Sequence, residues 1–97
     1  MEKELSKETL KILESLQQNE VNEAQIYATI AGFIKNEKDK ETLLRISAEE
    51  QKHAEIWAGY TNKKLKVQKR VVRKWAIIAR ILGYTFALKK MEMGENS

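Results

Sequence analysis

The residues whose types and spacing could support metal chemistry are Glu50 and His53, and His53 is the single histidine in 97 residues. Positions three apart on a helix lie on one face, so this carboxylate and this imidazole would project side by side. Glu-x-x-His pairs on inward-facing helices supply part of the carboxylate-bridged di-iron sites of four-helix bundles. The apolar residues Leu43, Ile46 and Trp57 continue the same face. An unpaired carboxylate is costly to bury, so a metal ion is one candidate partner for Glu50.

A second apolar stripe, earlier in the chain, is also interrupted by carboxylates. Its members alternate in spacing between three and four residues, which predicts an amphipathic helix: Leu13, Leu16, Glu20, Glu23, Tyr27, Ile30 and Ile34. Glu20 lies about 16 residues before the polar segment 36–39, and the Glu50–His53 pair begins about 11 residues after it, which at about 1.5 Å per residue is nearly the same height. We therefore expect Glu20, Glu50 and His53 to meet at one level of the core. The alternative is that these glutamates lie at the edge of a wide stripe, within reach of solvent.

The elements that must position these groups are predicted to be helices. The chain has no proline and four glycines, a composition that favours long helices over sheets and turns. The periodicity predicts three helices, over about residues 5–36, 40–58 and 62–93, in a single all-α domain spanning residues 1–97. Asn36 or Asp39 is expected to cap the second helix and Gly59 to end it. Since the connection 36–39 is short, the first two helices are expected to be antiparallel neighbours.

Composition narrows the classes of protein. The chain has no cysteine, which removes disulfides, zinc ribbons and thiol chemistry. The N-terminal residues do not resemble a signal peptide. The longest apolar run, residues 75–88, is interrupted by Arg80 and is too short to cross a bilayer. We therefore expect a cytoplasmic protein without a transmembrane segment.

A basic segment follows the second predicted helix. Seven Lys and Arg residues lie between residues 63 and 74, and no acidic residue occurs between Glu55 and Glu92. One interpretation is a basic helical surface that binds nucleic acid or a membrane. The other is an ordinary solvated helix face, because the segment lacks interleaved aromatic residues. On the second interpretation we expect no specific nucleic-acid binding.

Taken together, four segments of the chain resemble the rubrerythrin branch of the ferritin-like superfamily. They are 19–27 (NEVNEAQIY), 50–57 (EQKHAEIW), 79–88 (ARILGYTFAL) and 91–95 (MEMGE). Within that branch, these segments resemble the rubrerythrin-like domains that accompany vacuolar iron transporter proteins. The resemblance covers nearly the whole chain and implies a non-haem iron protein.

The resemblance also implies roles for individual residues. The first-helix glutamate of that family, with a tyrosine seven residues later, matches Glu20 and Tyr27. Its second-helix Glu-x-x-His matches Glu50 and His53, and its third-helix glutamate matches Glu95. The family continues with a fourth helix carrying another Glu-x-x-His, which these 97 residues lack. The chain also lacks cysteines for the second iron of rubrerythrin, so the electron relay of that family is not implied.

A complete di-iron site takes two glutamate helices and two Glu-x-x-His helices. Two copies of this chain in a symmetric dimer would supply them, so we expect a homodimer that completes a four-helix-type bundle. Glu20, Glu50, His53 and Glu95 are the candidate ligands, while Tyr27 orients a carboxylate and Glu23 is a further residue at the site. The expected cofactor is iron, for which manganese or zinc could substitute, with ferroxidase or O₂ and peroxide reduction as the reaction class. The alternatives are a truncated ferritin-like structural bundle without activity and the basic binding surface described above.

Overall fold

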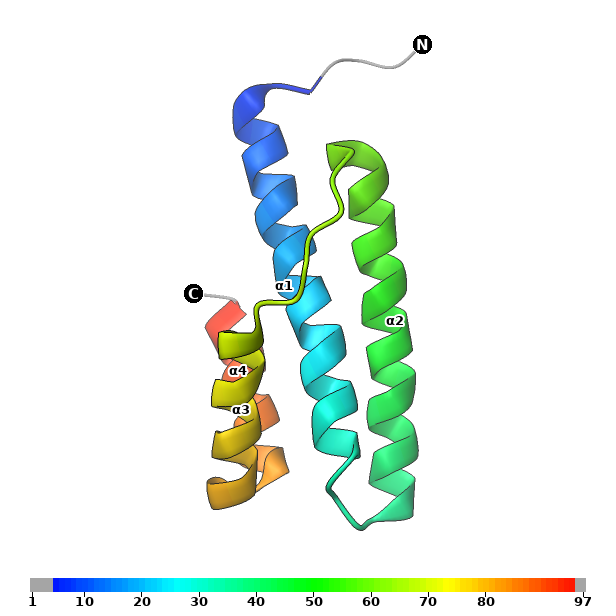
Figure 1. Cartoon of the computed structure of the whole chain (residues 1–97), viewed down its shortest axis with the longest axis vertical. Helices are drawn as coiled ribbons and strands as arrows, with labels where there is room; N and C mark the ends of the chain where they lie inside the picture. Colours follow the sequence, from blue (N-terminus) through cyan, green and yellow to red (C-terminus); the bar gives the residue numbers. More distant parts are fainter. Residues whose placement is uncertain (1–4, 96–97) are drawn as a thin grey trace.

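The chain folds into four helices and their connections, as a computed structural model shows for the backbone of residues 5–95 and the side chains of residues 5–94 (Figure 1). The helices are α1 (Lys7–Ala31), α2 (Glu37–Thr61), α3 (Lys69–Leu82) and α4 (Tyr84–Glu95). No residue within 5–95 forms a strand, so the predicted all-α class is confirmed. The predicted third long helix, over residues 62–93, is wrong, because an extended segment and a break at Gly83 replace it.

The first two helices form the predicted antiparallel hairpin (Figure 1). The Ser6 hydroxyl accepts a hydrogen bond from the Thr9 amide at the start of α1, and the Asn36 side chain accepts one from the Asp39 amide at the start of α2. Asn36, and not Asp39, therefore caps α2, which confirms one of the two alternatives predicted from the sequence. The helix α2 does not end at Gly59 but continues to Thr61, where Asn62 adopts a left-handed conformation with φ of 58°. Asparagine tolerates this conformation better than most residues, so it ends a helix much as glycine does.

Residues 63–68 are extended and lie along α1 instead of starting a helix. Side-chain amides of α1 hold them there: Gln17 donates to the Lys63 carbonyl and Gln18 to the Lys66 carbonyl, both at 2.8 Å. Asn22 accepts the Gln68 amide at 2.9 Å. These contacts satisfy backbone groups that helical hydrogen bonds would otherwise satisfy. Remaining extended therefore costs the segment little free energy.

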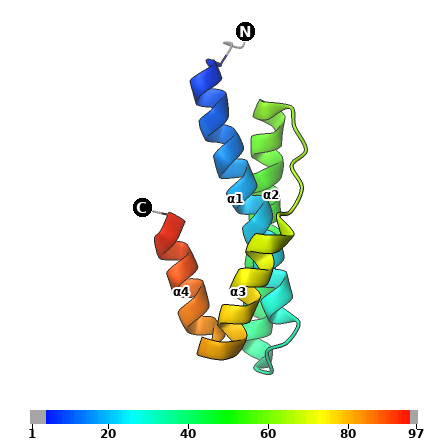
Figure 2. The same ribbon diagram turned by 60° about the vertical axis from the view of Figure 1, so that its left-hand side comes forward.

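Gly83 separates α3 from α4. Its φ of 95° and ψ of 146° lie in a region that residues with a side chain rarely adopt. The chain therefore turns sharply there, and α4 runs back beside α3 to form a corner at the end of the molecule that also holds the α1–α2 connection (Figure 2). This end is the part of the fold where all four helices come together.

The buried core lies between α1 and the corner formed by α3 and α4. Ile26 and Ile30 of α1 are fully buried at its centre. Its buried members come from all four helices and the α1–α2 connection: Ile26, Tyr27, Ile30, Ala31, Ile34, Leu43, Val72, Ala79, Ala87 and Met91. Leu43, near the start of α2, is the single member from that helix, so most of α2 packs against α1 alone.

Replacing Gly83 by alanine is expected to lower the free energy of unfolding by about 1–3 kcal/mol, since the backbone conformation there is strained for any residue with a Cβ. Gly59→Ala is the matched control, because a Cβ at Gly59, within α2, meets no atom within 4 Å. In a helix interior this control is expected to stabilise by up to about 1 kcal/mol. Urea unfolding followed by circular dichroism measures both. Equal effects of the two substitutions would contradict the assignment of strain to Gly83.

Candidate metal centre

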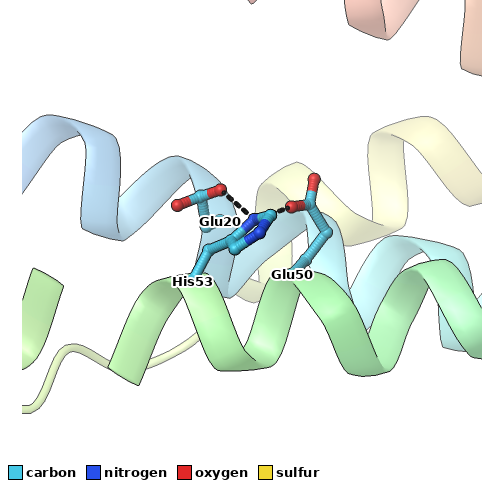
Figure 3. A group of neighbouring side chains, drawn as sticks. All are labelled: Glu20, Glu50 and His53. Atoms are coloured by element: carbon cyan, nitrogen blue, oxygen red, sulfur yellow. Dashed lines mark hydrogen bonds and ion pairs between the residues drawn. The ribbon is translucent and has the colours of Figure 1, made fainter. Parts of the chain in front are cut away.

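Glu20 from α1 and Glu50 and His53 from α2 converge on one point between the two helices (Figure 3). The Nδ1 atom of the His53 ring lies 3.0 Å from Oε1 of Glu20 and 3.0 Å from Oε1 of Glu50. One nitrogen of the His53 imidazole and one oxygen of each of the two carboxylates lie within 4.8 Å of one another. The expectation that these three side chains meet at one height is therefore confirmed. We refer to these three residues below as the carboxylate–histidine cluster.

Hydrogen bonds between the helices on either side of the cluster fix its register. The Ser47 hydroxyl donates to the Ala24 carbonyl at 2.6 Å, about one turn away from the cluster on each helix. Toward the other end of the hairpin, the Thr61 hydroxyl donates to the side-chain oxygen of Gln17 at 2.6 Å. Sliding α2 along α1 by one turn would break both bonds, so the cluster forms as a consequence of the hairpin's own register.

Trp57 completes the environment of Glu20. Its indole N–H donates to Oε2 of Glu20 at 2.7 Å, while Oε1 of the same carboxylate faces His53. Both oxygens of Glu20 are therefore oriented by α2. The apolar stripe predicts Trp57 as a packing residue. Its position four residues after His53 and seven after Glu50 nevertheless places it on the same helix face as these two residues.

The cluster is open to solvent on one side. The Glu20 and Glu50 side chains are 19% and 16% exposed, whereas the His53 side chain is 54% exposed. The expectation of a site enclosed in an apolar core is thus wrong, because α3 packs against α1 and α4 and leaves this part of α2 uncovered. A shallow cavity lined by Glu20, His53, Ile56 and Trp57 opens at this point.

The groups of the cluster change one another's pKa values. The hydrogen bond that His53 donates to Glu50, together with the negative charge of Glu20 and the hydrogen bond to it, raises the pKa of His53 above its usual value. Partial burial and the charge of Glu50 raise the pKa of Glu20, and the Trp57 N–H and His53 oppose that rise. The single proton that Nδ1 can carry is thus shared between two carboxylates. Such a point favours a cation.

The remaining predicted site residues lie elsewhere. Tyr27 is buried and donates a hydrogen bond to Glu92 of α4 at 3.0 Å. Burial and this carboxylate raise the pKa of Tyr27, and the charge of Glu50 adds to the rise. Glu23 is buried and lines a different cavity, between α1, α3 and α4. The side chain of Glu95, the last residue of α4, lies outside the described residues.

Glu92 of α4 is not among the residues predicted for the site. It precedes Glu95 by three residues, and its carboxylate accepts the hydrogen bond from Tyr27. The charges of Glu92 and Glu50 both raise the pKa of Tyr27. Its spacing of three residues from Glu95 places Glu92 on the same helix face, but the matched motif indicates Glu95.

The fold and the cluster together define a class: a small all-α protein with a carboxylate–imidazole cluster on an antiparallel helical hairpin. Comparison with known proteins gave no matching family model, no matching curated protein and no matching solved structure. The resemblance to rubrerythrin-like domains therefore remains a prediction from the motif residues. None of the helices within residues 5–95 combines the length and hydropathy needed to cross a bilayer.

Proposed function

We propose that the carboxylate–histidine cluster binds iron as part of a di-iron carboxylate site. The reaction of this site would be the oxidation of Fe(II), as in a ferroxidase, or the reduction of O₂ or peroxide. The observation that supports this is the convergence of two carboxylates and one imidazole, from two helices, within 4.8 Å. Mixed oxygen and nitrogen ligation suits Fe(II), and the same donors accept manganese or zinc. Bound iron would supply the redox chemistry, and the protein's residues would hold it and control access to it.

The residues of the cluster have distinct tasks in this proposal. Glu50, which lies against His53 on α2, would be the ligand shared by two ions, while Glu20 and His53 would each hold one ion. Trp57 holds Glu20 through its second oxygen, as residues behind metal ligands commonly do. The exposed edge of His53 leaves an open side through which a metal ion and a small oxidant can enter.

The proposal includes a second copy of the chain. The 97 residues contain one Glu-x-x-His motif, whereas a complete di-iron site uses two. Around the open side of the cluster, Leu16 of α1 and Ile56 and Tyr60 of α2 are exposed. A two-fold contact through this surface would cover these side chains and bring a second cluster to the first.

The test is metal content measured together with molar mass, on protein loaded with Fe(II) without oxygen. We expect about one iron per chain and a dimer for wild type, as the two-of-each geometry of such sites requires. A protein that keeps its helices but binds no iron would favour the alternative, a ferritin-like structural bundle without activity.

Metal affinity is expected to increase with pH through the titration of His53. A metal ion and a proton compete for Nδ1, and the neighbouring carboxylates raise the pKa of His53, so the competition persists to higher pH than for a free imidazole. Calorimetry with Zn²⁺ in buffers of different ionisation enthalpy counts the protons released. A proton count that does not change across the His53 titration would contradict a role for Nδ1.

Trp57→Phe is expected to weaken metal binding by about 10- to 100-fold, the range found when a residue that orients a ligand is lost. The substitution keeps an aromatic ring beside Tyr60 but removes the donor to Glu20. The matched control is Trp75→Phe on α3, whose side chain lines a different cavity. Equal metal affinity in both variants would show that the indole N–H does not position Glu20.

A further inference from the structure

The outward face of α3 combines cations with exposed aliphatic residues. Arg70, Arg73 and Lys74 are exposed on the first two turns, and Ile77 and Ile81 follow one turn apart on the same face, opposite the buried Val72 and Ala79. A helix face that contacts only solvent is expected to carry polar residues, whereas this face carries two isoleucines. Ile81 is 74% exposed, the highest value among the large apolar residues exposed in the described part of the chain.

The apolar part of this face continues around the corner between α3 and α4. Leu82 at the end of α3 and Phe86 in the first turn of α4 are also exposed. The corner lies at the end of the molecule that also holds the α1–α2 connection (Figure 2). We call these four residues, Ile77, Ile81, Leu82 and Phe86, the apolar corner.

The apolar corner lies within a long segment of the chain that carries cations and no acidic residue. Residues 62–91 hold ten of the 18 Lys and Arg residues and none of the 14 Asp and Glu residues of the chain. Three of these cations lie over aromatic rings: the Arg80 guanidinium is 4.2 Å from the centre of the Phe33 ring, Lys74 Nζ is 5.0 Å from that of Trp75, and Lys90 Nζ is 5.9 Å from that of Phe86. The ion pairs of the described residues engage one of the ten, Lys63, with Glu14. The part of the chain that carries the apolar corner is therefore rich in cations.

We propose that this surface docks on an anionic lipid bilayer, with the apolar corner inserted among the headgroups and the cations of α3 against them. An amphipathic surface of basic and large apolar residues is what binding in the interface plane requires. Exposed apolar side chains at one end of the molecule can enter a deformable lipid layer without needing a matching cavity. A second copy is a poorer occupant, since a two-fold contact would place this cationic surface against itself. Duplex nucleic acid would use the cations but gains little from exposed isoleucines.

The test is co-sedimentation of the full chain with vesicles of phosphatidylcholine alone or with about one third phosphatidylglycerol, a mixture that gives the surface a negative potential. We expect binding to the anionic vesicles, weakened by added salt. Absence of binding to anionic vesicles, or equal binding to neutral ones, would overturn the proposal.

Matched variants separate apolar insertion from charge. Ile81→Gln is expected to lower partitioning by about tenfold, because aliphatic carbons leave the interface. Ile12→Gln, an exposed isoleucine on α1, is the control and should change little. Arg70→Gln with Arg73→Gln should also cost about tenfold or more, since each cation near an anionic surface adds to binding. Lys7→Gln with Lys11→Gln makes the same change in net charge on α1 and should cost less.

Two results would assign the surface to another partner and end the proposal. The first has two parts. The two isoleucine variants bind lipid equally, and the protein binds duplex DNA at physiological salt, whereas the Arg70→Gln, Arg73→Gln variant does not bind DNA. The other is a dimer that Ile81→Gln converts to a monomer, as light scattering would show. Circular dichroism confirms that each variant remains folded. The proposal uses none of the cluster residues, so its failure leaves the metal site unaffected.

Discussion

Replacing Glu50 by glutamine is expected to abolish tight iron binding while leaving the four helices in place. The amide keeps the size of the side chain and can accept the hydrogen bond from His53, but it removes a negative charge from the point where the ligand atoms meet. If Glu50 bridges two ions, its loss affects both of them. The loss of affinity should therefore exceed the 10- to 100-fold, or about 1.4–2.7 kcal/mol, that follows from losing a residue behind a ligand.

Glu49→Gln is the control for this experiment. Glu49 is exposed, adjacent in sequence and outside the cluster, so its substitution makes the same change in net charge. His53→Ala provides an intermediate case, since it removes a ligand whose side chain is largely exposed and does not contribute to the core. Iron per chain after anaerobic loading should therefore decrease in the order Glu49→Gln, His53→Ala, Glu50→Gln. Equal iron in wild type and Glu50→Gln would show that the cluster is not the metal site.

The cluster could be predicted from sequence because it depends on local rules. The three- and four-residue spacing places Glu50 and His53 on one helix face, and the short connection at Asn36 fixes the antiparallel direction of the hairpin. Counting residues from that connection is then enough to bring Glu20 to the same height, as the 3.0 Å distances to His53 show. No long-range information enters these steps.

The third predicted helix failed because long-range contacts decide the conformation of residues 63–68. The hydrogen bonds from Gln17 and Gln18 to carbonyls of this segment join residues 46 and 48 positions apart. Nothing in the local pattern distinguishes these two glutamines from solvated ones. Gly83 is a visible breaker, but the apolar residues on both sides made the helix look continuous, and a single glycine is tolerated in many helices.

The depth of the site could not be predicted either. A stripe shows which residues share a face, but not whether another helix covers that face. In this chain α4 reaches α2 only near its start, where Tyr84 hydrogen-bonds Asp39 and Leu43 joins the core. Farther along α2, His53 and Ile56 have no helix over them and remain exposed. The openness of the carboxylate–histidine cluster thus follows from where the chain turns at Gly83.

Adding Fe(II) without oxygen is expected to stabilise the protein strongly and to shift it toward the dimer. Metal that binds only the folded, assembled form stabilises it by about 2.7 kcal/mol at a free metal concentration 100 times the dissociation constant. For a chain of this size, each kcal/mol raises the melting temperature by about 4–8 °C, so an increase of more than about 10 °C is expected. Glu50→Gln should show almost none of this increase. Thermal unfolding at several protein concentrations, with light scattering, measures stability and molar mass together.

The concentration dependence decides between two architectures for the same ligands. If the site is shared across a two-fold contact, the metal-dependent increase in melting temperature grows with protein concentration, because assembly and metal binding are linked. Without metal, the carboxylates of Glu20 and Glu50 from two copies repel one another, so the dimer should weaken as His53 loses its proton at high pH. If the increase is the same at every concentration and the protein stays monomeric, one chain holds the metal through Glu20, Glu50 and His53 alone. That result would exclude a site shared between two chains but would leave metal binding by one chain in the proposal. Water or substrate, instead of a second chain, would then occupy the open side of His53.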